Sequence, residues 1–264
     1  MTDEDITIDE KRVYDEKSGA TTTYVATSAG LARVNVSDDI VGEFSLDYRG
    51  ETVDVAADDR LAVATPEDVL LETADGFAET GFGPATAVGF DGDLLAAGDG
   101  RLARYDDGWE PIADIEDVRA ISGGLVAAAD GVYRTDGTSV GLDGANDVAA
   151  DGDLLAATDA GLYYLANGWM QAREGAFLVV AAGDDRAHAA TADGLFERTD
   201  GGTESGAGDD WVPVDLPVGG RIADVAYDEA TYAVTEDGTF FADAGDGWRH
   251  RSLGLPGVVG LAVR

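Results

Sequence analysis

The sequence contains no cysteine, only two histidines and only two lysines. The absence of cysteine excludes disulfide bonds and thiolate chemistry. Neither His188 nor His250 has a second histidine at the HxH or HxxxH spacing of metal ligands. We expect His188 to be a packed or edge residue and His250 to be exposed, and we assign no catalytic residue, metal site or cofactor.

Long hydrophobic runs are also absent. Runs such as AFLVVAA (176–182) are far shorter than the roughly 20 apolar residues that cross a bilayer. The opening MTDEDITIDEK has neither the basic region nor the apolar region of a signal peptide. These features predict a cytoplasmic protein without a membrane partner.

Basic residues are scarce, since 17 Lys and Arg stand against 53 Asp and Glu and give a formal net charge of -36. Self-repulsion of this kind opposes compactness at low salt, whereas molar salt shortens the Debye length to about 3 Å. The acidic composition therefore predicts a halophilic protein. It also argues against nucleic acid as a partner, because binding phosphates requires a basic surface.

A repeated unit runs through the chain. It reads as an apolar run, an Asp-Gly turn, a second apolar run, a Thr-x-x-Gly turn, a third apolar run and often Gly-Trp. It recurs about every 30 to 40 residues, a period typical of propellers and solenoids. The middle turn is clearest in ATSAGL (26–31), ATDAGL (157–162), ATADGL (190–195) and VTEDGT (234–239).

Seven such middle turns predict seven blades. ATPEDV (64–69) keeps the pattern without the glycine, and GDGRL (98–102) and ADGVY (129–133) are shorter versions. Short Val- and Leu-rich segments flank each turn, as in β-hairpins, with glycine supplying positive φ and the threonine hydroxyl holding the turn. The four tryptophans follow DG, NG or DD pairs, which places each at the start of an outer strand.

The two ends predict how the ring closes. Residues 23–46 supply only the later strands of a unit, while 258–264 supply an isolated inner strand. Paired in space, they complete one blade and remove the open sheet edge. We therefore expect an all-β, seven-bladed propeller forming a single domain over 1–264, with six blades as the alternative. Residues 1–20 and 200–210 are expected to be loosely ordered.

Two resemblances support a propeller. The ATDxGLY hairpin, the segment RTDGGTES (198–205) and the DG-Trp spacing resemble the Asp-box (BNR-like) repeats of sialidase-like propellers. The opening DEKRVYDEKSGATTTYVAT (9–27) with DIVGEF (39–44) resembles a haloarchaeal β-propeller family of uncharacterised function. The second resemblance implies a fold and a halophilic source, and no activity.

Three aspartates occupy one position of the repeat. Asp54, Asp147 and Asp224 each stand in an xDVA segment of an inner strand, where Ala87 and Ala120 stand in other units. If they project into the channel together, they could bind a cation or act as acid and base, because mutual repulsion raises at least one pKa. Alternatively, each hydrogen-bonds to the backbone of a neighbouring blade.

Four arginines form a second candidate set. Each falls at or just before an inner strand: Arg49, Arg119, Arg173 and Arg221. Their guanidinium groups would suit a small anionic ligand with a carboxylate or phosphate, or they pair with nearby acids. The middle turns carry a further acidic set, Asp68, Asp99, Asp130, Asp159, Asp193 and Asp237, which we expect to be hydrated hairpin tips.

Three classes of function remain open. The first is a non-enzymatic binding or scaffold propeller that presents loops to a protein partner, and we expect this one. The second is a channel-based hydrolase such as a glycosidase or lactonase. The third is a small-anion or metal sensor. A propeller fold alone does not decide between them.

Overall fold

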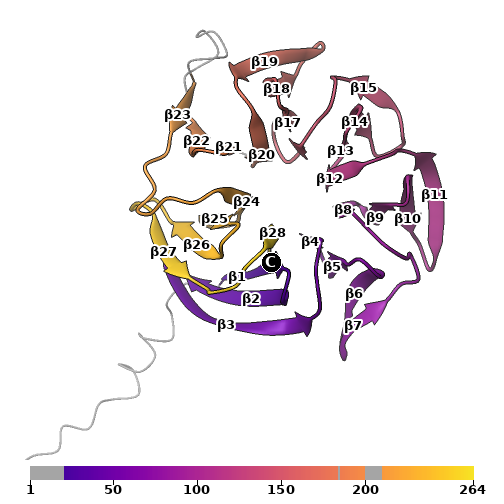
Figure 1. Cartoon of the computed structure of the whole chain (residues 1–264), viewed down its shortest axis with the longest axis horizontal. Coiled ribbons are helices and arrows are strands. Elements are labelled where there is room, and N and C mark those ends of the chain that lie inside the picture. Colours follow the sequence, from indigo (N-terminus) through magenta and orange to yellow (C-terminus); the bar gives the residue numbers. More distant parts are fainter. Residues whose placement is uncertain (1–20, 184, 200–209) are drawn as a thin grey trace, which may run out of the picture.

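The computed structural model describes residues 21–183, 185–199 and 210–264. Seven four-stranded antiparallel sheets stand around a central channel (Figure 1). The segments 1–20 and 200–210, which we expect to be loosely ordered, lie outside the described residues except for Asp210. Within the described ranges every regular element is a strand, and none is a helix long and apolar enough to cross a membrane.

We name the blades A to G and number their strands from the channel outwards. Blades A to D are built as follows: A, β28 (Val258–Val263), β1 (Thr21–Thr27), β2 (Gly30–Ser37), β3 (Ile40–Arg49); B, β4 (Asp54–Ala57), β5 (Leu61–Ala64), β6 (Val69–Thr73), β7 (Gly76–Glu79); C, β8 (Ala87–Asp91), β9 (Asp93–Gly98), β10 (Arg101–Tyr105), β11 (Trp109–Asp114); D, β12 (Val118–Ser122), β13 (Leu125–Ala128), β14 (Gly131–Arg134), β15 (Ser139–Gly141).

The remaining blades follow the same order. They are E, β16 (Asp147–Ala149), β17 (Leu155–Ala157), β18 (Gly161–Leu165), β19 (Trp169–Glu174); F, β20 (Phe177–Ala182), β21 (Ala187–Thr191), β22 (Leu195–Arg198), β23 (Trp211–Pro213); G, β24 (Ile222–Tyr227), β25 (Thr231–Thr235), β26 (Thr239–Asp243), β27 (Arg249–Ser252).

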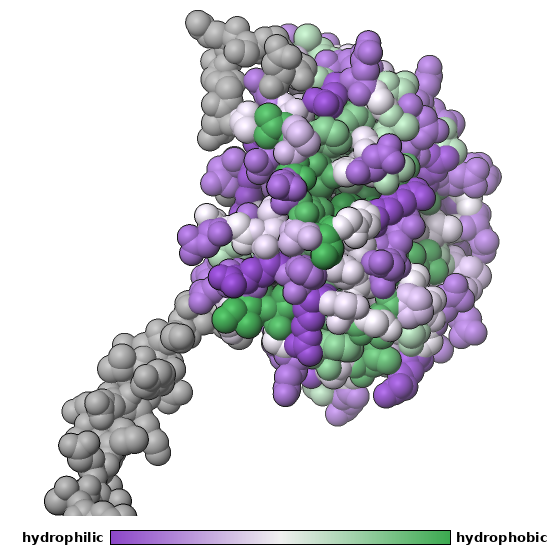
Figure 2. Space-filling view, turned by 60° about the vertical axis from the view of Figure 1, so that its left-hand side comes forward, coloured by the Kyte–Doolittle hydropathy of each residue, from purple (hydrophilic) through white to green (hydrophobic). Residues whose placement is uncertain are grey.

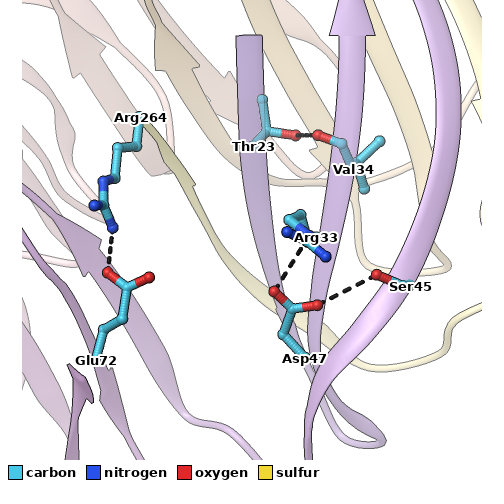
Figure 3. A network of polar contacts seen from close by, with 7 residues as sticks. All are labelled: Thr23, Arg33, Val34, Ser45, Asp47, Glu72 and Arg264. Carbon is cyan, nitrogen blue, oxygen red and sulfur yellow. Dashed lines mark hydrogen bonds and ion pairs between the residues drawn. The ribbon is translucent and has the colours of Figure 1, made fainter. Parts of the chain in front are cut away.

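Blade A closes the ring. Its inner strand β28 comes from the C-terminus and pairs with β1, so that Thr23 stands opposite Val263. Thr22 and Arg264 exchange two backbone hydrogen bonds of 3.3 and 3.0 Å beyond the strand end. The side chain of Arg264 also reaches Glu72 on β6 of blade B (Figure 3). The two predictions, seven blades and closure of the ring by the C-terminal strand, are confirmed. The six-bladed alternative is wrong.

In blades A, B, E, F and G a threonine side chain organises the middle turn. In blade A, Thr27 Oγ1 accepts the N–H of Ala29 and of Gly30, and donates to the Gly30 carbonyl at 2.7 Å. Gly30 has φ 140°, and a Cβ there would lie 2.0 Å from the Tyr48 carbonyl oxygen. Only glycine fits such a position. Thr65 and Thr158 repeat these bonds in blades B and E.

The hydrophobic core lies between neighbouring blades rather than at one centre. Seven clusters of buried residues fill the ring, and Val25, Val234 and Leu261 pack together at the junction of blades G and A. Trp109, Trp169 and Trp211 start outer strands, as expected, and Trp248 directly precedes β27. Trp109 Nε1 donates to Thr80 Oγ1 and Trp169 Nε1 to the Val140 carbonyl, both in the preceding blade and both at 3.1 Å. The recurring tryptophan therefore ties adjacent blades.

The ring has two distinct faces. One face, which we call the turn face, carries the middle turns between second and third strands and the linkers between blades, because both lie at the beginning of the inner strands. The far face carries the two other turns of each blade. Figure 2 shows the side that bears β23 and β27, where hydrophilic residues dominate and hydrophobic areas are small and separate.

Candidate functional site

The central channel is a cavity formed by described residues. It encloses about 660 Å³, and the innermost strands of all seven blades line it. Asp54, Asp147 and Asp224 are among the lining residues, together with backbone and small apolar side chains such as Ala56 and Ala149. Because the innermost strands are sheet edges, one row of their backbone N–H and C=O groups faces the channel.

The register of the inner strands places the three aspartates at one level. Asp54 pairs with Ala64, Asp147 with Ala157 and Asp224 with Val234, each opposite the end of a second strand. The same level is occupied in the other blades by Gly260 (A), Ala87 (C), Ala120 (D) and Val179 (F). The sequence-based grouping of the three aspartates with Ala87 and Ala120 therefore corresponds to one structural position.

Each of these carboxylates joins two blades. The Oδ1 atom of Asp54 accepts the N–H of the next residue, Val55, at 2.8 Å, and its Oδ2 atom accepts the N–H of Val88 in blade C at 2.9 Å. Asp147 binds Val148 and, in blade F, Val180, both at 2.8 Å. The carboxylates thus cap backbone donors on the inner edges of the sheets.

Asp224 repeats this bridge at the point where the ring closes. Its Oδ1 atom accepts the N–H of Val225 and its Oδ2 atom accepts the N–H of Leu261 on β28, both at 2.7 Å. Six of the seven edge N–H groups at this level are thus bound in pairs, in blades B and C, E and F, and G and A. The remaining edge N–H belongs to Ile121 of blade D, where neither Ala120 nor the preceding Ala87 supplies a carboxylate.

The spacing of the aspartates follows from this bridging. Carboxylates in adjacent blades would compete for one N–H group and repel each other, and none of the three aspartates lies in adjacent blades. Gly260 illustrates the limit on space, because a Cβ there would lie 3.3 Å from Asp54 Oδ1. Among residues 21–183, 185–199 and 210–264, no group of histidine and carboxylate side chains is arranged to hold a metal ion.

The enclosure of the channel changes the acidity of these groups. Burial raises the pKa of Asp54 and of Asp147 to about 7, although the backbone N–H bonds act in the opposite direction. Burial, followed by the nearby charge of Asp147, raises the pKa of Asp224 well above its ordinary value. The three carboxyls therefore interact electrostatically and share the channel as a coupled set.

The residue that precedes the aspartate level on some inner strands forms a second set of hydrogen bonds between blades. In blades C, D and E this position is polar. Thr86 Oγ1 donates to the Val118 carbonyl at 2.9 Å, and Arg119 Nη1 donates to Asn146 Oδ1 at 2.6 Å. Asn146 Nδ2 donates in turn to the Phe177 carbonyl at 2.9 Å. Each bond reaches the following blade, so polar side chains tie the C–D, D–E and E–F junctions.

The F–G junction is tied by a buried histidine. His188 Nδ1 lies 2.9 Å from the Tyr227 hydroxyl, which lies 3.2 Å from the Ala181 carbonyl. Burial lowers the pKa of His188 to about 4, so the ring is neutral at neutral pH. The edge of Trp248 packs against the same histidine. His188 is the packed side chain that the sequence predicts, and His250 is exposed.

The four candidate arginines do not converge. Arg119 makes the Asn146 contact described above, and Arg221 forms an ion pair of 3.0 Å with Glu236. Arg173 lies on outer strand β19, where it donates to the Trp211 carbonyl at 2.9 Å and stacks over Phe196. Arg49 ends outer strand β3 and is exposed. The described channel lining contains no arginine.

Asp68 differs from the other turn aspartates. It is buried, and its carboxylate accepts the N–H groups of Val69, Gly81, Phe82 and Gly83. Asp68 therefore holds the linker that leads from blade B to blade C, which explains why this turn replaces the usual glycine. The expectation of a hydrated tip is wrong for Asp68. It holds for Asp99, Asp130, Asp159, Asp193 and Asp237, which are exposed.

Sequence reasoning missed several of these ties. Thr86, Asn146 and Tyr227 carry no motif, and only their register beside the inner strand reveals their role. The signal available in the sequence was the polar residue directly before the aligned aspartate or alanine, as in Thr86-Ala87 and Asn146-Asp147.

The comparisons with known proteins agree with this architecture. Residues 7–264 match the model of the family described as "Beta-prop_HVO_0234:-like, beta propeller". The chain belongs to this β-propeller family. The resemblance to a haloarchaeal propeller family that the sequence suggested is thereby confirmed. No functionally curated protein matches the chain.

Solved structures share the fold at low sequence identity. The computationally designed Ika8 protein is 15% identical with a TM-score of 0.58, and the match covers 93% of this chain and 91% of that one. A chain of the nidogen/laminin complex is 11% identical with a TM-score of 0.55, over 92% and 98%. AztD from Citrobacter koseri is 12% identical with a TM-score of 0.54, over 90% and 82%. These likenesses show the fold alone.

Proposed function

We propose that this protein is a non-enzymatic binding propeller that presents the loops of its turn face to a protein partner. The observation that carries the proposal is the use of the channel carboxylates. Asp54, Asp147 and Asp224 each hold two backbone N–H groups in neighbouring blades, so these acidic groups serve to fix the ring. A ring fixed in this way is a rigid frame for the loops around it.

A channel-based hydrolase or an anion or metal sensor receives less support from the same geometry. Catalytic acids and bases need an accessible lone pair or proton directed at substrate. Here both oxygens of each carboxylate are already directed at backbone donors. The arginines that would hold an anion are engaged outside the described channel lining, as Arg173 illustrates.

We further propose that the protein works inside a cell with a high internal salt concentration. The excess of 53 acidic over 17 basic residues supports this setting. Ion pairs such as Arg104–Asp93, at 3.6 Å and half-exposed, contribute little at high ionic strength. Under these conditions a stable partner interface requires apolar contacts as well as charge.

Chemical cross-linking tests the proposal. The full chain is cross-linked in extracts of its own cells at native salt, and the attached proteins are identified by mass spectrometry. We expect one partner at a fixed stoichiometry, with cross-links concentrated on turn-face segments such as 66–68 and 236–238. A parallel thermal-shift screen with small metabolites provides the alternative. A metabolite that stabilises the protein by binding in the channel, without any stoichiometric protein partner, contradicts the proposal.

A further inference from the structure

The mouth of the channel on the turn face has two different halves. The residue before the aspartate level is polar in the adjacent blades C, D and E, where Thr86, Arg119 and Asn146 make the ties described above. In the adjacent blades F, G, A and B it is apolar. These residues are Leu178, Ala223, Val259 and Val53. The mouth therefore has one hydrogen-bonded side and one apolar side.

The apolar side is incompletely covered. Leu178, Ala223 and Val53 pack partly into the junctions between blades. Val259 stands at a bulge of β28 and keeps 47% of its surface exposed. Val218, in the linker before β24, is 37% exposed. We call Val53, Leu178, Val218, Ala223 and Val259 the mouth patch.

Val218 and Val259 share one face for a structural reason. The linker before β24 and the linker before β28 both contact the turn at 235–238. Glu236 N–H donates to the Arg221 carbonyl at 2.9 Å, and the Gly257 N–H donates to the Glu236 carbonyl at 3.1 Å. The other two exposed large apolar side chains, Ile40 and Met170, belong to turns of the far face or directly follow one. Among the described residues, the turn face thus gathers its exposed large apolar side chains at blades G and A.

Acidic side chains lie beside the exposed valines. Glu236 and Asp237 lie on the turn between Val218 and Val259, and Asp193 lies on the corresponding turn of blade F; all three are exposed. Arg221 neutralises Glu236 in part through their 3.0 Å ion pair. An occupant of the mouth patch would therefore meet apolar side chains next to negative charge, which favours a basic partner and opposes an acidic one.

We infer that the mouth patch binds a peptide segment of a protein partner in which an apolar side chain is flanked by lysine or arginine. The inference rests on the proposed binding function and names its surface and the chemistry of its partner. The apolar side chain packs against Val259, and the flanking basic residues approach Glu236, Asp237 and Asp193. A second copy of this chain fits less well, because it would bring another acidic turn face against this one.

Two synthetic peptides test the chemistry of the patch. Both contain the same leucine-valine core, flanked in one by lysines and in the other by glutamates. Binding to the full chain is followed by fluorescence anisotropy at about 0.1 M and about 1 M salt, where the Debye length falls from about 10 to about 3 Å. We expect saturable binding of the lysine-flanked peptide at both salt concentrations, weaker at the higher one. Equal binding of the glutamate-flanked peptide, or binding of neither, overturns the inference.

Matched variants locate the site. Val259→Lys places a positive charge in the patch, whereas Ile40→Lys makes the same change at a 63% exposed side chain on the far face. We expect Val259→Lys to weaken binding at least tenfold and Ile40→Lys to leave it unchanged. Circular dichroism verifies that both variants fold. Equal affinity of the wild type and Val259→Lys contradicts the inference.

Further outcomes separate this inference from the proposed function. If a stoichiometric cross-linked partner is retained by Val259→Lys, the mouth patch is the wrong surface while the binding function stands. If no partner is found but the lysine-flanked peptide binds through Val259, the patch stands and the proposed function fails. Self-association in sedimentation experiments that Val259→Lys abolishes makes the patch a contact between copies and also overturns the inference.

Discussion

Asp224 accepts the N–H of Leu261 at 2.7 Å, so a carboxylate of blade G holds the strand that completes blade A. The same junction is also held by Thr21 Oγ1, which donates to Asp228 Oδ2 at 3.0 Å, and, between the outer strands, by Arg251, which donates to the carbonyl of Gly42. The terminal strand β28 is thus fixed from both sides, by its pairing with β1 and by a neighbouring blade.

Replacement of Asp224 by alanine is expected to loosen β28. The change leaves the N–H groups of Val225 and Leu261 without their acceptor, at a cost of about 1–3 kcal/mol of unfolding free energy. Hydrogen exchange followed by mass spectrometry should show faster exchange across 258–263, and chemical denaturation should give the stability. Asp193→Ala, at an exposed turn, serves as the control and should change neither. Unaltered protection of β28 in Asp224→Ala would contradict the role assigned to this carboxylate.

Much of this architecture follows from the sequence because the repeat is local. Thr27 and Gly30 act within four residues, so the pattern Thr-x-x-Gly predicts a hairpin without knowledge of the rest of the chain. The blade count and the closure by 258–264 then follow from counting hairpins and from the incomplete unit at each end.

The side-chain hydrogen bonds between blades could not be predicted to the same extent, because they depend on how neighbouring inner strands are aligned along the channel. Asp54 reaches Val88 across 34 residues, and the choice between a backbone bond and a ligand site depends on that distance. The arginines show a second limit of prediction from sequence position. The sequence groups Arg49 and Arg173 because both precede an inner strand. In the structure Arg49 ends an outer strand and Arg173 lies in another, so both are far from the channel.

The raised pKa values of the channel aspartates predict that part of the protein's stability is lost as the pH rises. Asp54 and Asp147 have folded-state pKa values of about 7, raised from an ordinary 3.8 by burial. A group with a raised folded-state pKa stabilises the protein below its unfolded pKa, and this contribution is lost as the pH rises through the folded value. The part of the stability that depends on these carboxyls should therefore decrease between about pH 4 and pH 7.

The difference between the wild type and Asp54→Asn/Asp147→Asn isolates this effect. Each pKa unit is worth about 1.4 kcal/mol, so the unfolding free energy of the wild type relative to the variant should fall by at least about 1 kcal/mol over this range. Denaturation at a constant high salt concentration keeps the total acidic charge screened. A difference in unfolding free energy that does not change with pH would show that Asp54 and Asp147 keep the ordinary pKa of an aspartate in the folded protein.

The buried contact between His188 and Tyr227 predicts that removal of one hydroxyl oxygen lowers the stability of the protein. Tyr227→Phe removes the hydroxyl that lies 2.9 Å from His188 Nδ1 and 3.2 Å from the Ala181 carbonyl. Leaving the buried imidazole without this partner should cost about 1–3 kcal/mol. Tyr133→Phe removes a hydroxyl that is bonded to the exposed Asp130, and should cost much less. Denaturation midpoints compare the two, and equal losses would argue against a special role of the F–G tie.

Salt is expected to stabilise the protein, because its 53 acidic residues repel one another and only 17 basic residues offset them. Raising the salt concentration from about 0.1 to about 1 M shortens the Debye length from about 10 to about 3 Å and weakens this repulsion. The melting temperature followed by circular dichroism should rise with potassium chloride. Sucrose is the control, since it favours compact states without screening charge. A melting temperature that responds to sucrose and not to potassium chloride would show that charge repulsion contributes little to stability, and would remove the support that composition gives to a high-salt setting.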